Sequence, residues 1–168
     1  ATADKSLKEC LISPDGKKEL IPVMAIYGAN AAGKSNMIQA LLLMRDMVCG
    51  EYAKPLKGAE LPWEPFAFTD DKDERPTDFI YYYEGTKYAY GYSFNRDRII
   101  SEYLYHWPNG REALVFSRDN DKYEFRESIQ EQLTLAGRTS ENRLYLTSSN
   151  EWNCPQTEKA YLWFQRYL

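Results

Sequence analysis

Two hydrophobic patterns near the start of the chain predict a strand followed by a helix. An apolar-rich stretch at residues 7–12 and a nearly continuous apolar run at residues 21–27 flank the turn-forming residues 13–16. This arrangement predicts a hairpin whose second strand is buried on both faces. Apolar residues then recur at helical spacing as far as Gly50, a helix-stopping residue. They are Met37, Ala40, Leu41, Met44 and Val48.

The rest of the chain changes character twice. Residues 51–78 contain four prolines and a run of charges, which predicts a connector with little regular structure. Residues 79–126 alternate aromatic runs with short turns, and this pattern predicts an antiparallel β-meander. Its expected strands are residues 79–84, 88–94, 99–107, 113–117 and 123–125. The pattern of residues 127–168 predicts short helices. Together with the strand, loop and helix predicted for residues 1–50, this places the chain in the α/β class.

Composition and charge place this fold in a globular protein. The 168 residues are 43% hydrophobic and carry a net charge of −4, which disfavours a surface built mainly to neutralise nucleic acid or anionic lipid. No apolar run could span a bilayer and no signal peptide is visible, so we expect no membrane and a cytoplasmic location. Three separated cysteines form no CxxC pair, which argues against a zinc or redox site. Because the chain begins with Ala1, we expect it to be part of a longer product.

A glycine-rich motif joins the predicted strand to the predicted helix. Residues 28–35, GANAAGKS, match the full pattern G-x-x-x-x-G-K-[ST] of a phosphate-binding P-loop. Such a loop points its backbone N–H groups at the β-phosphate, which requires unhindered backbone at Gly28 and Gly33. The helix that starts near Lys34 directs its N-terminal dipole at the same anion. The motif therefore predicts a nucleoside triphosphate site.

The chemistry of a P-loop gives individual residues their expected roles. Lys34 reaches the β- and γ-phosphates and is the predicted catalytic residue, while the Ser35 hydroxyl is the predicted Mg²⁺ ligand. We expect ATP and Mg²⁺ as cofactors. The predicted nucleotide-binding residues are Gly28, Ala29, Asn30, Ala31, Ala32, Gly33, Lys34, Ser35 and Asn36.

The sequence around the loop resembles a known group of ATPases. Residues 26–41, IYGANAAGKSNMIQAL, resemble ABC/SMC-type ATPase heads. More narrowly, they look like the bacterial and archaeal AAA-type ATP-binding proteins that share this head with the overcoming-lysogenisation-defect (OLD) family nucleases. The likeness continues through residues 64–66, 88–92, 100–104, 110–116 and 142–147 and covers most of the chain.

The resemblance implies both an architecture and a role. The chain would be the N-terminal lobe of an ABC/SMC-like P-loop head, with an antiparallel β-meander and C-terminal helices. Such a head binds ATP rather than GTP and forms a homodimer or larger oligomer around it. It would drive an effector nuclease or toxin partner, in phage defence or in DNA transactions.

The chain also departs from this family pattern. Such heads imply a Walker B strand ending in Asp-Glu, a signature motif and a switch histidine, and none can be found. The nearest acid after an apolar run is Glu84, whose neighbour Gly85 indicates a turn, and His106 lies in an aromatic strand. Gln130 and Gln132 are candidates for a γ-phosphate sensor, but neither lies in a recognisable motif. We therefore expect ATP binding with little turnover.

Other functions are compatible with parts of the sequence. A small P-loop kinase fits the length, but it should continue in alternating strands and helices. A GTPase should carry an N-K-x-D motif, which is absent, and a nucleotide-binding regulatory module without turnover stays open. Strand aromatics could stack on nucleic-acid bases, but few Lys or Arg lie among them, which favours core packing. These aromatics are Tyr81, Tyr83, Tyr88 and Tyr90. Whether DNA binds stays open.

Overall fold

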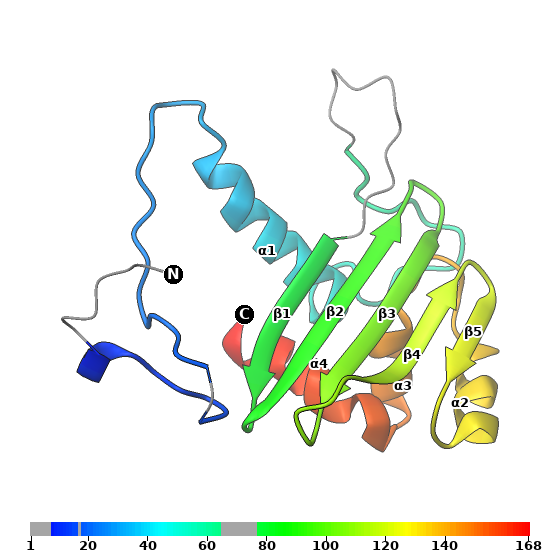
Figure 1. Ribbon diagram of the computed structural model, residues 1–168. Helices are drawn as coiled ribbons and strands as arrows, with labels where there is room; N and C mark the ends of the chain where they lie inside the picture. The colour runs from blue at the N-terminus through cyan, green and yellow to red at the C-terminus, as the bar shows by residue number, and fades with distance from the viewer. Residues whose placement is uncertain (1–7, 17, 65–76) are drawn as a thin grey trace.

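The computed structural model describes residues 8–16, 18–64 and 77–168, and the described part holds one sheet packed against helices (Figure 1). The sheet order is β1-β2-β3-β4-β5, with every neighbouring pair antiparallel. The strands are β1 (Thr77–Tyr83), β2 (Thr86–Phe94), β3 (Ile99–Trp107), β4 (Ala113–Asp119) and β5 (Lys122–Phe125). The predicted antiparallel meander is confirmed.

Short turns explain why this sheet is antiparallel. Glu84 and Gly85 connect β1 to β2 with φ angles of 48° and 74°, and positive φ at both central residues is the signature of a tight hairpin turn. A second turn, closed by a hydrogen bond from Gly110 N to the Trp107 carbonyl, connects β3 to β4. Connections of this length cannot cross over to a parallel neighbour.

Helices cover one face of the sheet (Figure 1). They are α1 (Lys34–Cys49), α2 (Ile129–Ala136), α3 (Tyr145–Glu151) and α4 (Pro155–Tyr167), and a short 3-10 helix, η1, spans Lys8–Cys10. The helix α4 contacts β1, α1 and α3, while α2 contacts β5 and α3. The predicted helical region after residue 127 is confirmed.

The core between the two layers is aromatic. Tyr81 stacks on Trp163 with ring centroids 4.3 Å apart, and Tyr90 meets Phe164 edge to face at 5.5 Å. The buried Tyr81 hydroxyl donates a hydrogen bond to the Ala160 carbonyl at 3.2 Å. All four strand tyrosines considered for base stacking, Tyr81, Tyr83, Tyr88 and Tyr90, are buried. Their rings therefore serve packing and are not available to stack on bases.

The helix α1 forms where predicted, but only its second half is buried. Met44, Met47 and Val48 lie in the core, whereas Met37 in the first half is 47% exposed. In Figure 1 the N-terminal half of α1 extends beyond the edge of the sheet. The helical spacing of apolar residues predicted the helix correctly, but it did not indicate that the rest of the fold packs against only the second half.

The predicted strand at residues 21–27 is wrong for the described structure. These residues form no strand, and their side chains are exposed, reaching 81% at Val23 and 91% at Tyr27. An isolated antiparallel bridge between Ile12 and Leu20 is all that remains of the predicted hairpin among the described residues. The physical reason is the lack of a partner, because no described strand lies alongside the run to complete its backbone hydrogen bonds.

The predicted connector is described in part. Residues 51–64 contain no helix or strand, as expected, and β1 begins at Thr77, inside the predicted connector. Residues 65–76 of that connector, and residue 7 of the predicted hairpin, lie outside the described residues.

Candidate functional site

The motif at residues 28–35 forms an exposed loop that runs directly into α1. Gly33 stands at the N-cap of α1 with φ of 79°, a left-handed conformation that glycine adopts without strain. Ala31 has φ of 64° and adopts the same region at some cost. A Cβ at Gly28 would make only ordinary contacts, the nearest being Ala32 Cβ at 3.6 Å. The structure thus supports the expected glycine requirement at Gly33, while nothing in this loop conformation demands it at Gly28.

Lys34 folds back over this loop. Its Nζ donates hydrogen bonds to the carbonyls of Gly28 at 2.7 Å and Ala29 at 2.5 Å. A turn between Ala29 and Ala32, closed by an N–H to carbonyl bond of 3.3 Å, holds the loop in shape. An ammonium has three donors, so the geometry leaves one for another acceptor.

The N-terminus of α1 is electrostatically suited to an anion. No acidic residue lies in its first turn, no side chain caps it, and Lys34 adds a positive charge where the helix dipole is already positive. The first N–H groups of a helix have no acceptor within the helix. A charge placed against the dipole costs stability unless an anion accompanies it, so the residues present fit a phosphate group.

The remaining motif residues surround the same helix end. Asn30, Ser35 and Asn36 are exposed, so the Ser35 hydroxyl is free to reach a ligand at this position. Within the described residues, no group of three His, Cys, Asp or Glu side chains could hold a metal ion by itself. A bound Mg²⁺ would therefore depend on Ser35 together with oxygens of the nucleotide or of residues outside the described part.

Four other candidates take structural positions. Glu84 lies in the β1–β2 turn and pairs with Lys159 at 2.8 Å, and His106 is half-buried in β3. Gln132 is fully buried, where its amide donates to the Glu127 carbonyl at 2.6 Å and accepts from the Tyr145 hydroxyl at 3.3 Å. Gln130 is exposed at the start of α2, which lies beside β5 at the opposite edge of the sheet from the P-loop (Figure 1). The structure does not bring these residues to the loop.

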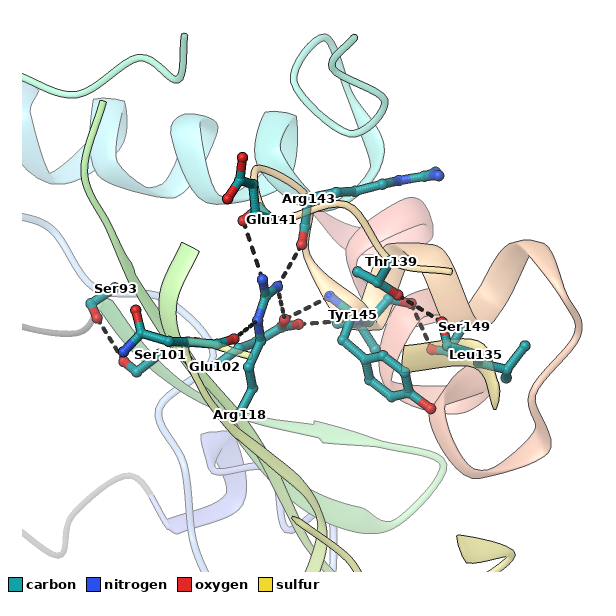
Figure 2. Close-up of polar contacts among 12 residues, drawn as sticks. Ser93, Ser101, Glu102, Arg118, Leu135, Thr139, Glu141, Arg143, Tyr145 and Ser149 are labelled. Atoms are coloured by element: carbon teal, nitrogen blue, oxygen red, sulfur yellow. Dashed lines mark hydrogen bonds and ion pairs between the residues drawn. The ribbon is translucent and has the colours of Figure 1, made fainter. Parts of the chain in front are cut away.

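A buried charge cluster was missed by sequence reasoning (Figure 2). Glu102 on β3 is fully buried, and its carboxylate accepts hydrogen bonds from the backbone N–H groups of Tyr145 at 2.6 Å and Leu146 at 2.9 Å. The Tyr90 hydroxyl donates to the same carboxylate at 2.9 Å. The carboxylate therefore caps the N-terminus of α3 from a strand far away in sequence. The available signal was a glutamate on the core-facing side of an aromatic strand.

Arg118 on β4 is the ionic partner of Glu102, at 4.0 Å. Its guanidinium also donates to the backbone carbonyls of Asn120, Arg143 and Glu141, at 2.8, 2.8 and 3.2 Å. Figure 2 shows this guanidinium between the sheet and the segment that precedes α3. Burial raises the pKa of the Glu102 carboxyl, while Arg118 and the backbone N–H groups act in the opposite direction.

A glycine-rich loop entering a helix, beside an antiparallel sheet with a helical layer, is consistent with an AAA-type nucleotide-binding domain. A family model described as "AAA domain, putative AbiEii toxin, Type IV TA system" matches residues 23–168, which include the loop, the sheet and α1 to α4. The chain belongs to this family, whose AAA domain indicates a nucleotide-binding ATPase. No curated protein and no solved structure matches the chain. Within the described residues no helix is long and apolar enough to cross a membrane.

Proposed function

We propose that the chain is the ATP-binding lobe of an ABC/SMC-like ATPase head, related to the ATPase domain of the OLD-family nucleases. The observation that carries this proposal is the start of α1, where Gly33 is left-handed, Lys34 lies over the loop and no acid occupies the first turn. Membership in an AAA-type family supports nucleotide as the ligand. The resemblance of residues 26–41 to such heads supports the narrower class.

Binding would use backbone and side-chain groups already close together. The free N–H groups of α1 and of the loop would donate to the phosphates, and Lys34 would exchange a loop carbonyl for a phosphate oxygen. Ser35 would ligate Mg²⁺, which neutralises phosphate charge when bound. Asn30, Ala32 and Asn36 flank these groups and complete the proposed contact surface.

The head is proposed to work as a homodimer or larger oligomer coupled to an effector. The exposed apolar side chains of residues 21–27 and of the first half of α1 support an interface there, since such surfaces are normally covered. An effector nuclease or a toxin is the proposed partner, and the description of the matching family, which names a putative toxin, favours the second. Phage defence is the proposed setting.

A small P-loop kinase is the weaker alternative. Such an enzyme needs parallel strands separated by helices after the P-loop. All five described strands are antiparallel and consecutive, which favours the ATPase head over the kinase.

Calorimetry with Mg-ATP tests the proposal directly. Lys34→Ala should abolish measurable binding, because it removes the ammonium that faces the phosphates. Its thermal unfolding should match that of the original chain, since Lys34 contacts only exposed loop carbonyls. Lys57→Ala, an exposed lysine in the connector, is the matched control and should bind normally. Unchanged affinity in Lys34→Ala would remove the P-loop assignment, and a titration with Mg-GTP measures the preference for adenine.

A further inference from the structure

A cavity lies at the opposite end of the sheet from the P-loop. It has a volume of about 700 Å³ and is bounded by the β3–β4 hairpin, the segment after β5 and the first turns of α4. In Figure 1 these elements meet at the lower end of the sheet, whereas the P-loop precedes α1 at the top. A cavity of this size is in the range that holds small molecules or a protruding side chain.

One tyrosine hydroxyl of the cavity lining has no hydrogen-bond partner among the described residues. Tyr88 is only 4% exposed and lines the cavity, yet its hydroxyl makes no hydrogen bond with the described residues, unlike the hydroxyls of Tyr81 and Tyr90. Its ring lies 6.2 Å from that of His106, which lines the same cavity. The buried side-chain atoms without a partner among the described residues belong to Asn142 and Arg143, so the Tyr88 oxygen reaches solvent through the cavity and is available to a ligand.

The charges around the cavity favour a cation. The lining holds two cations, Lys159 and Arg126, and each pairs with a carboxylate just outside it, Glu84 at 2.8 Å and Glu124 at 3.1 Å. The remaining lining carboxylates belong to Glu112 and Glu127, which form no ion pair with the described residues. Burial lowers the pKa of His106 and outweighs the opposing effect of Glu127, which favours the neutral imidazole.

The donor set decides which kind of cation fits. Two carboxylates and an imidazole do not make a group that could hold a metal ion among the described residues. The partly exposed rings of Tyr105 and His106, beside two carboxylates, instead suit a flat organic cation, which uses ring faces and several N–H donors at once. We propose that this cavity binds a guanidinium group, recognised by Glu112, Glu127 and the Tyr88 hydroxyl, with an arginine side chain of a protein partner as its main source.

Titration of the chain with Nα-acetylarginine amide, followed by amide NMR shifts around the cavity, tests this proposal. We expect saturable binding, and no saturable binding of Nα-acetylcitrulline amide, an uncharged molecule of nearly the same shape. Glu112→Gln combined with Glu127→Gln should weaken arginine amide binding by about tenfold or more. Tyr88→Phe should weaken it by about threefold to tenfold, because one hydrogen bond is lost.

Matched controls separate this site from general charge and from the P-loop. Glu60→Gln combined with Glu64→Gln makes the same charge change at exposed positions away from the cavity and should leave affinity unchanged. Mg-ATP binding should be unchanged in every variant, so failure here is distinct from failure of the P-loop assignment. Ethylguanidinium distinguishes the two sources of a guanidinium group. If it binds as tightly as Nα-acetylarginine amide, the natural ligand is a free small molecule, and if it binds more weakly, the ligand is an arginine of a peptide. Equal binding of the citrulline amide, no binding of the arginine amide, or full affinity in the double variant would overturn the proposal.

Discussion

At the scale of single residues, the sheet is joined to the helical layer by a charge in the core. Glu102 accepts hydrogen bonds from the first two residues of α3 and from Tyr90, and it faces Arg118 at 4.0 Å. A buried carboxylate without such partners would lose several kcal/mol of solvation. Its partners come from three different elements, so one side chain on β3 fixes the positions of β2, β4 and α3 relative to each other.

Glu102→Gln should destabilise the chain by about 3 kcal/mol, because it leaves Arg118 without a buried counter-charge and turns one acceptor into a donor facing a backbone N–H. Urea unfolding at neutral pH measures the loss. Glu124→Gln on β5, at the edge of the sheet, is the control, since its pair with Arg126 is exposed and should contribute less than about 1 kcal/mol. Equal stability of the two variants would show that the Glu102 cluster does not hold the layers together.

At the scale of elements, the end of α1 depends on close packing. Gly50 donates its N–H to the Asp46 carbonyl, and a Cβ at this position would lie 2.7 Å from Asp46 Cα. Thr147 on α3 donates its hydroxyl to the Val48 carbonyl at 2.7 Å, which ties the same helix end to the helical layer. The helix that begins at the P-loop is therefore fixed at its far end.

Gly50→Ala should destabilise the chain by about 1–3 kcal/mol, because the backbone of Asp46 cannot move away from the new methyl group without disturbing α1. Gly137→Ala provides the matched control at the end of α2, where φ is −64° and a Cβ would make only 3.6 Å contacts. That substitution should be neutral or stabilise the chain by up to about 1 kcal/mol. Thermal unfolding compares the two, and a larger loss in Gly137→Ala would contradict the packing explanation.

Glu151 at the end of α3 should make stability depend on pH. The hydrogen bond from Arg143, with a further contribution from Lys54, lowers the pKa of its carboxyl from 4.5 to about 2. Its folded-state pKa lies below the unfolded value, so the stabilisation is present above about pH 4.5 and is lost as the pH falls towards 2.

Glu151→Gln should therefore cost about 0.2–1 kcal/mol at pH 7, as expected for a half-exposed ion pair, and much less at pH 3. Urea unfolding at both pH values measures the difference between the original chain and the variant. Glu60→Gln, in the connector, should show no such change with pH. A difference for Glu151→Gln that is the same at pH 3 and pH 7 would argue against the ion pair as the cause.

The sequence predicted elements whose partners are close along the chain. The meander follows from turns such as Glu84-Gly85, and α1 follows from its apolar spacing and Gly50, because these signals are local. Residues 21–27 were predicted to form a buried strand but are exposed. An apolar run indicates that a segment can be buried, but it does not indicate which segments would pack against it. The Glu102 cluster was missed for a related reason, because its partners lie 43 and 44 residues away.

The candidate site was predicted in part. The loop, its entry into α1 and the position of Lys34 followed from the motif, because a P-loop is a continuous segment whose geometry is set by its own residues. The assignments of Gln130 and Gln132 had no such local basis, and Gln132 instead packs against Tyr145 in the core.

At the scale of the whole molecule, the chain should bind ATP and hydrolyse it very slowly. The P-loop supplies phosphate contacts and one Mg²⁺ ligand, but in-line attack also needs a group that orients water and opposing charge in the transition state. Among the described residues, no acid lies in the first turn of α1, no carboxylate pairs with Lys34, and Glu84 pairs with Lys159 elsewhere. Binding should therefore survive without turnover.

Phosphate release at saturating ATP measures this directly, with Lys34→Ala as the background. We expect the two rates to be indistinguishable. Clear multiple turnover by the original chain that Lys34→Ala abolishes would show that a catalytic carboxylate is present, and Glu84→Gln would then be the first variant to compare.

The exposed run at residues 20–27 has a consequence for the handling of the chain. It carries no charge, it is rich in residues that favour strands, and its backbone is unpaired apart from the bridge at Leu20. A segment of this kind is a template for cross-β self-assembly, and Pro22 is its one built-in interruption. Copies of the chain without a partner would therefore aggregate through the stretch that leads into the P-loop. A partner that covers this stretch would keep the chain soluble in addition to its role in function.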